Sequence, residues 1–276
     1  MSQQISVMLH TPAHSGVSGA LTYESDIAHP PGTLVRAPLG TRELLGVVWE
    51  NPETTPGGVK LRAIHNALEG IAPLSQTWRQ LVQFAASYYQ RSAGEIALAA
   101  LPNQLRELTT EQWARRLKRK VKSKLPSDAA LEQLAQELHA PNLTPEQAQV
   151  LADIASNAGP FLLFGNTGSG KTEVYLRAAQ ALLERDPHAQ ILVMVPEINL
   201  TPQLEARFRA RFAPHWGADC LVSMHSSLTP AQRLSNWLAA HNGHARIVLG
   251  TRMAVFASMP HLQLIVVDEE HDPSYK

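Results

Sequence analysis

Residues 165–172 read G-N-T-G-S-G-K-T, a glycine-rich turn that constrains the fold of this chain more than any other segment. The spacing G-x-x-x-x-G-K-T is typical of a phosphate-binding loop, whose backbone N–H groups surround the phosphates of a nucleotide. The apolar run Phe161–Phe164 is the buried strand expected before the loop. A helix is expected to begin near Lys171. Its N-terminus would face the phosphates, because the free N–H groups there favour negative charge. The alternative is a glycine-rich turn that binds nothing.

Each position of the loop has a role in this interpretation. Glycine adopts positive φ angles easily, so Gly165, Gly168 and Gly170 would let the backbone wrap around an anion. Lys171 is expected to reach the β- and γ-phosphates of ATP, and the Thr172 hydroxyl to bind Mg²⁺. The expected nucleotide-binding residues of the loop are Gly165, Asn166, Thr167, Gly168, Ser169, Gly170, Lys171 and Thr172.

A second motif follows the apolar segment L-Q-L-I-V-V near the end of the chain. Asp268, Glu269, Glu270 and His271 come directly after this segment. In phosphate-loop ATPases an acid at this place holds Mg²⁺, and a neighbouring glutamate deprotonates the attacking water. Asp268 is therefore expected to be a metal ligand and Glu269 the general base. A solvated acidic turn is the alternative.

The second half of the chain has the pattern of an α/β fold. Short apolar runs alternate with helical stretches from Leu143 onward, which predicts a mostly parallel sheet with crossover helices. Thr144, Thr201 and Thr229 each precede a proline, so each is expected to cap the start of a helix. Gln147 follows Thr144 by three residues, where it would complete a capping box.

The first half of the chain is rich in β-type segments. Residues 1–100 contain I-S-V-M-L, G-T-L-V-R-A-P-L-G and E-L-L-G-V-V-W-E, which are separated by Pro/Gly turns. The helical segment that follows places Trp78, Leu81, Ala85 and Tyr88 on one face. This face is expected to lie in the core.

A charged segment joins the two halves. Residues 101–142 are punctuated by proline and helical in pattern. The run at 115–124 within them carries seven Lys/Arg and no acid. This run is either a phosphate-contacting patch or a solvated helix face or linker. The expected domains are 1–100, a basic connector at 101–142, and an ATPase lobe at 143–276.

Composition limits the cellular compartment and the kinds of metal site, but it does not indicate the reaction. Cys220 is the single cysteine among 276 residues, which excludes a disulfide framework or a cysteine-rich zinc site within the chain. The N-terminus lacks the pattern of a signal peptide, and no apolar segment approaches the length of a membrane span. A cytoplasmic protein with no membrane contact is expected.

The order of these motifs resembles the PriA (primosomal protein N′) family of superfamily 2 DNA helicases. D-E-E-H is similar to helicase motif II, G-N-T-G-S-G-K-T-E-V-Y-L to motif I and L-V-M-V-P-E-I-N-L-T-P-Q to motif Ia. Residues 224–258 resemble the segment around motif Ib. The segments P-L-G-T-R-E-L-L-G-V-V-W and A-A-S-Y-Y-Q-R-S-A-G-E-I-A-L-A-A-L-P resemble the family's N-terminal domain for the 3′ end of DNA.

The resemblance implies an ATP-dependent 3′→5′ DNA helicase of replication restart and primosome assembly, with ATP and Mg²⁺ as cofactors. A β-rich DNA-binding domain would precede one RecA-like phosphate-loop lobe. The partners would be forked or single-stranded DNA, primosome proteins and single-stranded DNA-binding protein. The connector would be a shortened or degenerate winged-helix region.

The chain would then be an N-terminal fragment that ends after motif II. The second motor lobe, its arginines and a zinc site would belong to the missing part, so the fragment alone is not expected to unwind DNA. A non-catalytic module that binds nucleotide and DNA is the alternative to an active helicase. A kinase fits less well, because no segment suggests an acceptor pocket or a lid.

The resemblance also implies roles for residues outside the loop. Gln147 would read adenine. The alternative role of the same side chain is to complete the capping box. Glu270 and His271 would relay between nucleotide and DNA. The remaining expected DNA contacts are Thr201, Thr251 and Arg252 in the lobe, and Gly40, Arg62 and Thr22 in a pocket for the 3′-terminal nucleotide. Thr22 stands where the family usually has an aspartate, so looser discrimination for a free 3′-hydroxyl is expected.

Overall fold

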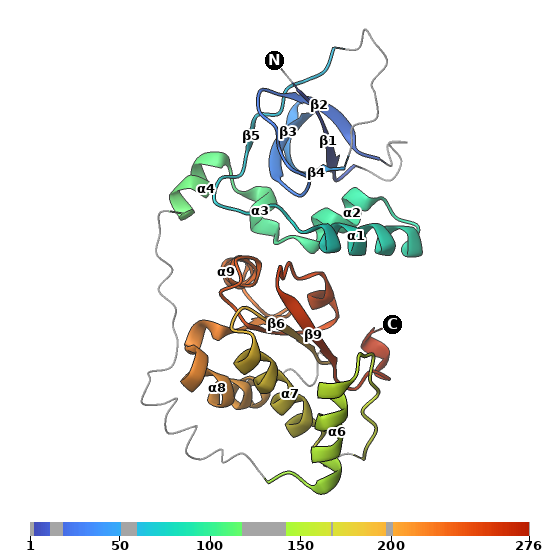
Figure 1. Ribbon diagram of the computed structural model, residues 1–276. Coiled ribbons are helices and arrows are strands. Elements are labelled where there is room, and N and C mark those ends of the chain that lie inside the picture. Colours follow the sequence, from blue (N-terminus) through green and yellow to red (C-terminus); the bar gives the residue numbers. More distant parts are fainter. Residues whose placement is uncertain are drawn as a thin grey trace. The chain divides into compact units, whose positions relative to one another are not determined.

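The computed structural model describes residues 3–11, 19–50, 60–117, 142–166, 168–196 and 201–275. Two compact units make up the chain (Figure 1). The first unit comprises residues 1–122, 227–242 and 256–260, and the second comprises residues 123–226, 243–255 and 261–276. The predicted boundaries near residues 100 and 142 stay predictions. Most of the predicted connector, including residues 118–124 of its basic run, lies outside the described residues.

A five-stranded antiparallel sheet with strand order β2-β1-β4-β3-β5 forms the centre of the first unit. Its strands are β1 (Gln3–Leu9), β2 (Leu21–Ser25), β3 (Leu34–Leu39), β4 (Arg42–Trp49) and β5 (Asn66–Ala67). Val7, Val35 and Val47 are fully buried in this sheet. The predicted β-rich N-terminal domain is confirmed.

The first unit also contains helices. They are α1 (Gln76–Tyr89), α2 (Ala93–Ala100), α3 (Asn103–Glu107), α4 (Thr110–Leu117) and, from the later part of the chain, α9 (Pro230–His241). Gly94 lets α2 approach β1 closely, because a Cβ atom there would lie 1.9 Å from the Leu9 carbonyl oxygen.

The core face predicted for α1 is only partly correct. Trp78 and Ala85 are buried as expected, and Val82 is buried beside them. Tyr88 is exposed, so its placement in the core was wrong. Helix α1 carries large apolar residues on more than one face, and helical spacing alone does not say which face meets the sheet.

A buried arginine ties β3 to α3. The Arg36 guanidinium donates hydrogen bonds to the carbonyl oxygens of Leu105 (2.7 Å), Arg106 (3.0 Å) and Leu108. Glu43 lies 3.9 Å away and supplies the opposite charge. Burial lowers the pKa of the Arg36 guanidinium, and the Glu43 carboxylate opposes this effect. Arg36 therefore satisfies backbone acceptors at the C-terminal end of a short helix.

The second unit contains a parallel sheet with strand order β7-β8-β6-β9. Its strands are β6 (Gln190–Met194), β7 (Leu221–Met224), β8 (Ile247–Gly250) and β9 (Leu262–Val267). Its helices are α6 (Pro145–Ser156), α7 (Lys171–Arg185) and α8 (Pro202–Trp216), with short 3-10 turns at η2 (Ala218–Cys220), η3 (Arg252–Phe256) and η4 (Pro273–Tyr275). The predicted RecA-like α/β lobe is confirmed.

The three predicted helix starts are also confirmed. The side chains of Thr144, Thr201 and Thr229 each accept the backbone N–H three residues ahead, and a proline follows each of them. The caps hold because hydroxyl acceptors satisfy N–H groups that a helix leaves free at its start.

The strand predicted at Phe161–Phe164 is absent, and the Phe164 side chain is 91% exposed. Strand β9 pairs with β6 alone among the described strands, and Ile265 and Val267 are exposed on it. A strand needs a neighbour to satisfy its backbone groups. The apolar run shows strand propensity, but no described strand pairs with it.

The core of the second unit lies between its sheet and helices α7 and α8. Phe208 and Phe212 of α8 pack with Leu183 of α7 and Ile191 of β6. Cys220 is buried in the same cluster, and burial raises the pKa of its thiol to about 11. No helix of the described residues is long and apolar enough to cross a membrane.

Candidate nucleotide and DNA sites

The glycine-rich loop leads directly into α7. Gly168 and Gly170 have φ angles of 83° and 81°, so both need the conformation that glycine adopts easily. Gly170 is the N-cap of α7, and no described side chain caps its first turn. The Lys171 ammonium donates to the carbonyl oxygens of Gly165 (2.8 Å) and Asn166 (3.1 Å). The lysine thus folds back onto the loop. Thr167 lies outside the described residues.

Gln147 connects α6 to this loop. Its Oε1 accepts the Thr144 backbone N–H at 3.1 Å, which completes the capping box. Its Nε2 donates to the Ser169 carbonyl oxygen at 3.0 Å. Both ends of the amide thus have protein partners, and reading of adenine by Gln147 stays a prediction.

The second motif meets α7 through a tyrosine that sequence reasoning missed. Asp268 follows β9, and its Oδ2 accepts a hydrogen bond from the Tyr175 hydroxyl at 3.2 Å. Its Oδ1 accepts the Glu269 backbone N–H at 3.1 Å. The Thr172 side chain lies near enough to the Tyr175 hydroxyl to lower the pKa of the phenol. The two predicted metal ligands, Thr172 and Asp268, therefore share one neighbour.

Tyr175 is held rigidly in this position. Its ring is buried and stacks on Phe208, with centroids 6.2 Å apart. Burial raises the pKa of its phenol, the Thr172 side chain lowers it, and the Asp268 charge raises it. The phenol is therefore protonated at neutral pH and donates to Asp268. Its position one turn after Thr172 was a usable signal, because a buried tyrosine hydroxyl needs a partner.

A buried ionic cluster supports the first turn of α7. Glu173 accepts hydrogen bonds from Arg177 (2.9 Å) and from Arg211 of α8 (2.7 Å). Its side chain is almost completely buried. The positive charges of two arginines compensate the negative charge of the buried carboxylate. The contact with Arg211 links the first turn of α7 to α8. Sequence reasoning missed this cluster.

The remaining residues of the second motif form a turn. Glu269 has a φ angle of 51°, and His271 Nε2 lies 3.4 Å from Glu269 Oε2. Glu270 and His271 are exposed. The Tyr275 hydroxyl donates to the Asp268 carbonyl oxygen at 3.1 Å and closes the turn.

The predicted DNA contacts of the second unit lie at the ends of elements. Thr201 caps α8 by accepting the Leu204 backbone N–H at 3.3 Å. Thr251 follows β8, and its backbone N–H donates to the Met224 carbonyl oxygen at 3.2 Å. Arg252 begins η3 and is exposed.

The structure brings two of the predicted 3′-end residues of the first unit, Gly40 and Arg62, into contact. Arg62 Nη1 donates to the Gly40 carbonyl oxygen at 2.7 Å, and Gly40 has a φ angle of 60° in the turn between β3 and β4. The Arg62 carbonyl accepts the backbone N–H of Glu24 at 2.9 Å, two residues from Thr22. Tyr23, which sequence reasoning missed, donates to the Pro38 carbonyl oxygen at 2.9 Å.

Comparison with known sequences agrees with this division of sites. Residues 6–102 match the sequence model of the PriA 3′ DNA-binding domain, and residues 144–276 match that of the DEAD/DEAH box helicases. The chain belongs to the PriA family.

Curated members of the PriA family align with most of this chain. Replication restart protein PriA of Treponema pallidum is 33% identical over 268 residues, which is 93% of this chain and 37% of the relative. The Haemophilus influenzae protein is 30% identical over 91% of this chain and 42% of the relative. The Synechocystis protein is 45% identical over 50% of this chain. The chain thus spans less than half the length of these PriA relatives.

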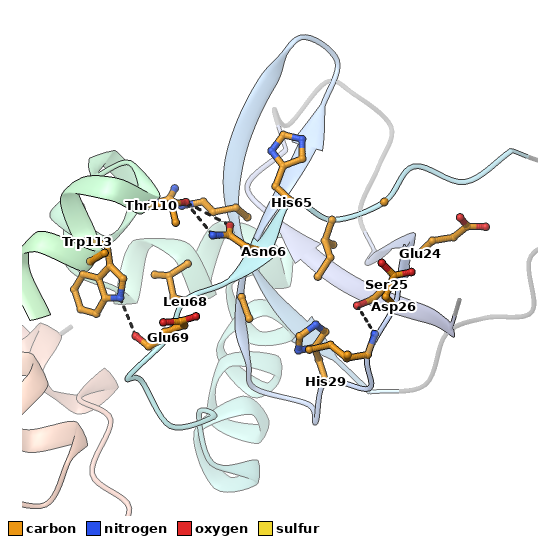
Figure 2. A pocket seen from close by; sticks show the side chains of 16 residues that line it. Glu24, Ser25, Asp26, His29, His65, Asn66, Leu68, Glu69, Thr110 and Trp113 are labelled. Atoms are coloured by element: carbon orange, nitrogen blue, oxygen red, sulfur yellow. Dashed lines mark hydrogen bonds between the residues drawn. The ribbon is translucent and has the colours of Figure 1, made fainter. Parts of the chain in front are cut away.

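A pocket of about 640 Å³ in the first unit is separate from the predicted 3′-end residues of the PriA-type domain. Figure 2 shows Trp113 of α4 at one side, where its indole N–H donates to the Glu69 carbonyl oxygen at 2.9 Å. Glu24, Asp26 and Glu69 line the pocket, whereas Thr22, Gly40 and Arg62 do not. The cationic Arg36 and two histidines line the same pocket, so its wall carries both signs of charge.

Asp268, which follows β9, and Thr172 in α7 fit a magnesium ion bound together with a nucleotide. Mg²⁺ is commonly held by one or two carboxylates together with phosphate oxygens of the substrate. Asp268 and Thr172 provide one carboxylate and one hydroxyl, both hard oxygen ligands. Among the described residues, no group of three His, Cys, Asp or Glu could hold a metal ion without such help.

Proposed function

We propose that this chain binds Mg-ATP at the phosphate loop and is part of an ATP-dependent DNA helicase. The observation that supports this most strongly is the hydrogen bond to Asp268 from the hydroxyl of Tyr175, which lies one turn after Thr172 in α7. Two motifs almost a hundred residues apart in sequence therefore meet at one end of α7. In the PriA setting, the activity would be 3′→5′ unwinding during replication restart and primosome assembly.

The residues of the lobe would divide the work of hydrolysis. Lys171 would exchange the carbonyl oxygens of Gly165 and Asn166 for oxygens of the β- and γ-phosphates. Glu269 would accept a proton from the attacking water. Thr172 and Asp268 would hold Mg²⁺, which when bound neutralises charge on the phosphates.

Tyr175 would act as a positioning residue for this site. Its hydroxyl holds one oxygen of Asp268, while the backbone N–H of Glu269 holds the other. The carboxylate is therefore oriented before metal arrives. Tyr175→Phe keeps the ring on Phe208 and removes only this hydrogen bond, so it should raise the Mg²⁺ concentration needed for half-maximal nucleotide binding. An unchanged Mg²⁺ requirement would refute the positioning role.

The first unit would bind the 3′ end of DNA through Gly40, Arg62 and Thr22. The contact between Arg62 and Gly40 supports this proposal, because it holds a cationic side chain at an exposed turn. Thr201, Thr251 and Arg252 would touch the DNA backbone, and Glu270 and His271 would couple DNA to nucleotide. Primosome proteins and single-stranded DNA-binding protein would be the partners.

A pair of oligonucleotides tests the 3′-end proposal with the whole chain. The wild type should bind an oligonucleotide with a free 3′-hydroxyl about 3- to 10-fold more tightly than one with a 3′-phosphate, since one hydrogen bond is worth about 1 kcal/mol. Arg62→Ala should abolish the difference when affinities are measured by fluorescence anisotropy.

Lys60→Ala is the matched control for this test. It removes the same charge from an exposed site two residues away. It should weaken both oligonucleotides equally, as loss of a simple phosphate contact does. Equal wild-type affinity for the two ends would contradict the 3′-end pocket.

A further inference from the structure

Two contacts join α8 to the part of α7 that follows the phosphate loop. The Arg211 guanidinium donates to the Glu173 carboxylate at 2.7 Å, and the Phe208 ring stacks on the Tyr175 ring with centroids 6.2 Å apart. Glu173 directly follows Thr172 in the chain, and Tyr175 lies one turn after Thr172. The first turn of α7 is therefore held by side chains of α8.

The contact between Arg211 and Glu173 is shielded from water. The two side chains are only 17% and 6% exposed, and the Arg211 Nε atom is buried without a hydrogen-bond partner among the described residues. Opposite charges attract more strongly where less water screens them. Arg177 also donates to Glu173, but it lies on α7 itself and adds no contact between the two helices. Arg211 thus makes the one polar contact from α8 to this carboxylate that the structure describes.

The other end of α8 is attached to the strand ends where DNA contacts are proposed. Glu205, one turn after the Thr201 cap, accepts a hydrogen bond from the Ser223 hydroxyl of β7 at 2.9 Å. The carbonyl oxygen of Met224, the next residue of β7, accepts the backbone N–H of Thr251 at 3.2 Å. These contacts connect the two threonines that are proposed to touch the DNA backbone.

Helix α8 is continuous between the two ends. A rise of about 1.5 Å per residue places Arg211 about 15 Å along the axis from Thr201. Leu204, Phe208 and Arg211 are spaced by four and three residues, so they lie on one face of the helix. Leu204 and Phe208 pack in the same buried cluster as Leu183 of α7. A displacement at the start of α8 therefore moves Arg211 as well, because a packed helix shifts as a unit.

We propose that Arg211 is a positioning residue of the nucleotide site and that α8 makes this site respond to DNA. The inference rests on the proposed function, since it needs Mg-ATP at the phosphate loop and DNA at Thr201. DNA bound at Thr201 fixes the start of α8, and Arg211 then holds the first turn of α7 through Glu173. Less order has to be created when the nucleotide binds, so DNA tightens nucleotide binding.

The test measures the affinity of the whole chain for a fluorescent ATP analogue in Mg²⁺, with and without saturating oligo(dT). In wild type, DNA should tighten binding of the analogue by at least about 5-fold. The analogue should tighten oligo(dT) binding by the same factor, because coupling between two ligands is reciprocal. Arg211→Met breaks the contact between the helices and should reduce both effects to less than about twofold.

Arg177→Met is the matched control for Arg211→Met. It removes the other arginine that bonds Glu173 and leaves the contact from α8 in place. The Arg177 variant should keep a response to DNA of at least about 5-fold, whereas a purely structural role of the cluster would make the two variants alike.

Ser223→Ala tests the other end of α8 with a smaller change. It removes the hydroxyl that donates to Glu205, and Glu205 keeps its hydrogen bonds from Arg209 at 3.0 and 2.7 Å. The response to DNA should fall, while the affinity for the analogue without DNA should stay within about twofold of wild type. If Arg211→Met does not fold, as urea unfolding would show, Ser223→Ala decides the test.

An unchanged response to DNA in Arg211→Met or in Ser223→Ala would overturn the inference. An equal loss of the response in Arg177→Met and Arg211→Met would also overturn it, because the charge around Glu173 would then matter and the contact between the helices would not. A wild type that binds both ligands without any effect of one on the other would refute the inference and leave the proposed function intact. A wild type that binds no nucleotide or no DNA would refute the proposed function itself, and the inference with it.

Discussion

Lys171→Ala is expected to weaken Mg-ATP binding by about 10- to 150-fold, the value of one or two hydrogen bonds to a charged group. The Lys171 ammonium lies beside the loop, on the carbonyl oxygens of Gly165 and Asn166, where phosphate oxygens are expected to take their place. Alanine preserves α7 because it is the best helix former. Titration with a fluorescent ATP analogue measures the effect.

Arg185→Ala is the matched control for this variant. It removes one positive charge from the exposed C-terminal end of the same helix. It should leave nucleotide affinity within about twofold of wild type, because exposed charges farther apart than about 10 Å are largely screened. Equal affinity in wild type and Lys171→Ala would contradict the assignment of the loop.

Arg36→Met is expected to destabilise the first unit by about 3–5 kcal/mol. The substitution removes the donors of three backbone carbonyl groups, at Leu105, Arg106 and Leu108. Buried acceptors that lose their partner keep the full cost of desolvation. Urea unfolding should show the change as a lower midpoint with a similar slope.

Arg42→Met is the control for the buried arginine. Arg42 lies on β4 and is exposed, so its loss should change stability by less than about 0.5 kcal/mol. If both variants unfold at the wild-type midpoint, the three carbonyl contacts of Arg36 do not stabilise the unit.

The parts of the fold that follow local rules were predictable from the sequence. Thr144, Thr201 and Thr229 cap helices because a hydroxyl followed by proline suits a helix start wherever it occurs. The strand predicted at Phe161–Phe164 and the buried Tyr88 failed for the opposite reason. Both predictions depend on which other element of the fold packs or pairs with the segment. An apolar pattern in the sequence does not contain that information.

The same distinction applies to the candidate nucleotide site. The spacing of the loop and the acids after β9 pointed to Lys171 and Asp268, since each motif is contiguous in sequence. The residues that support them were missed because their partners are distant. Tyr175 contacts a residue 93 positions away, and Glu173 contacts one 38 positions away. Such pairs follow from the packing of α7 against its neighbours.

The Mg²⁺ dependence of nucleotide affinity tests most directly whether Thr172 and Asp268 complete a metal site beside the phosphate loop. In wild type, removal of Mg²⁺ with EDTA should weaken binding of the ATP analogue by at least about 10-fold, because the metal neutralises phosphate charge. Asp268→Asn should bind with the same low affinity in Mg²⁺ and in EDTA. Wild-type affinity that does not change with Mg²⁺, or the absence of saturable binding, would contradict the proposed nucleotide site.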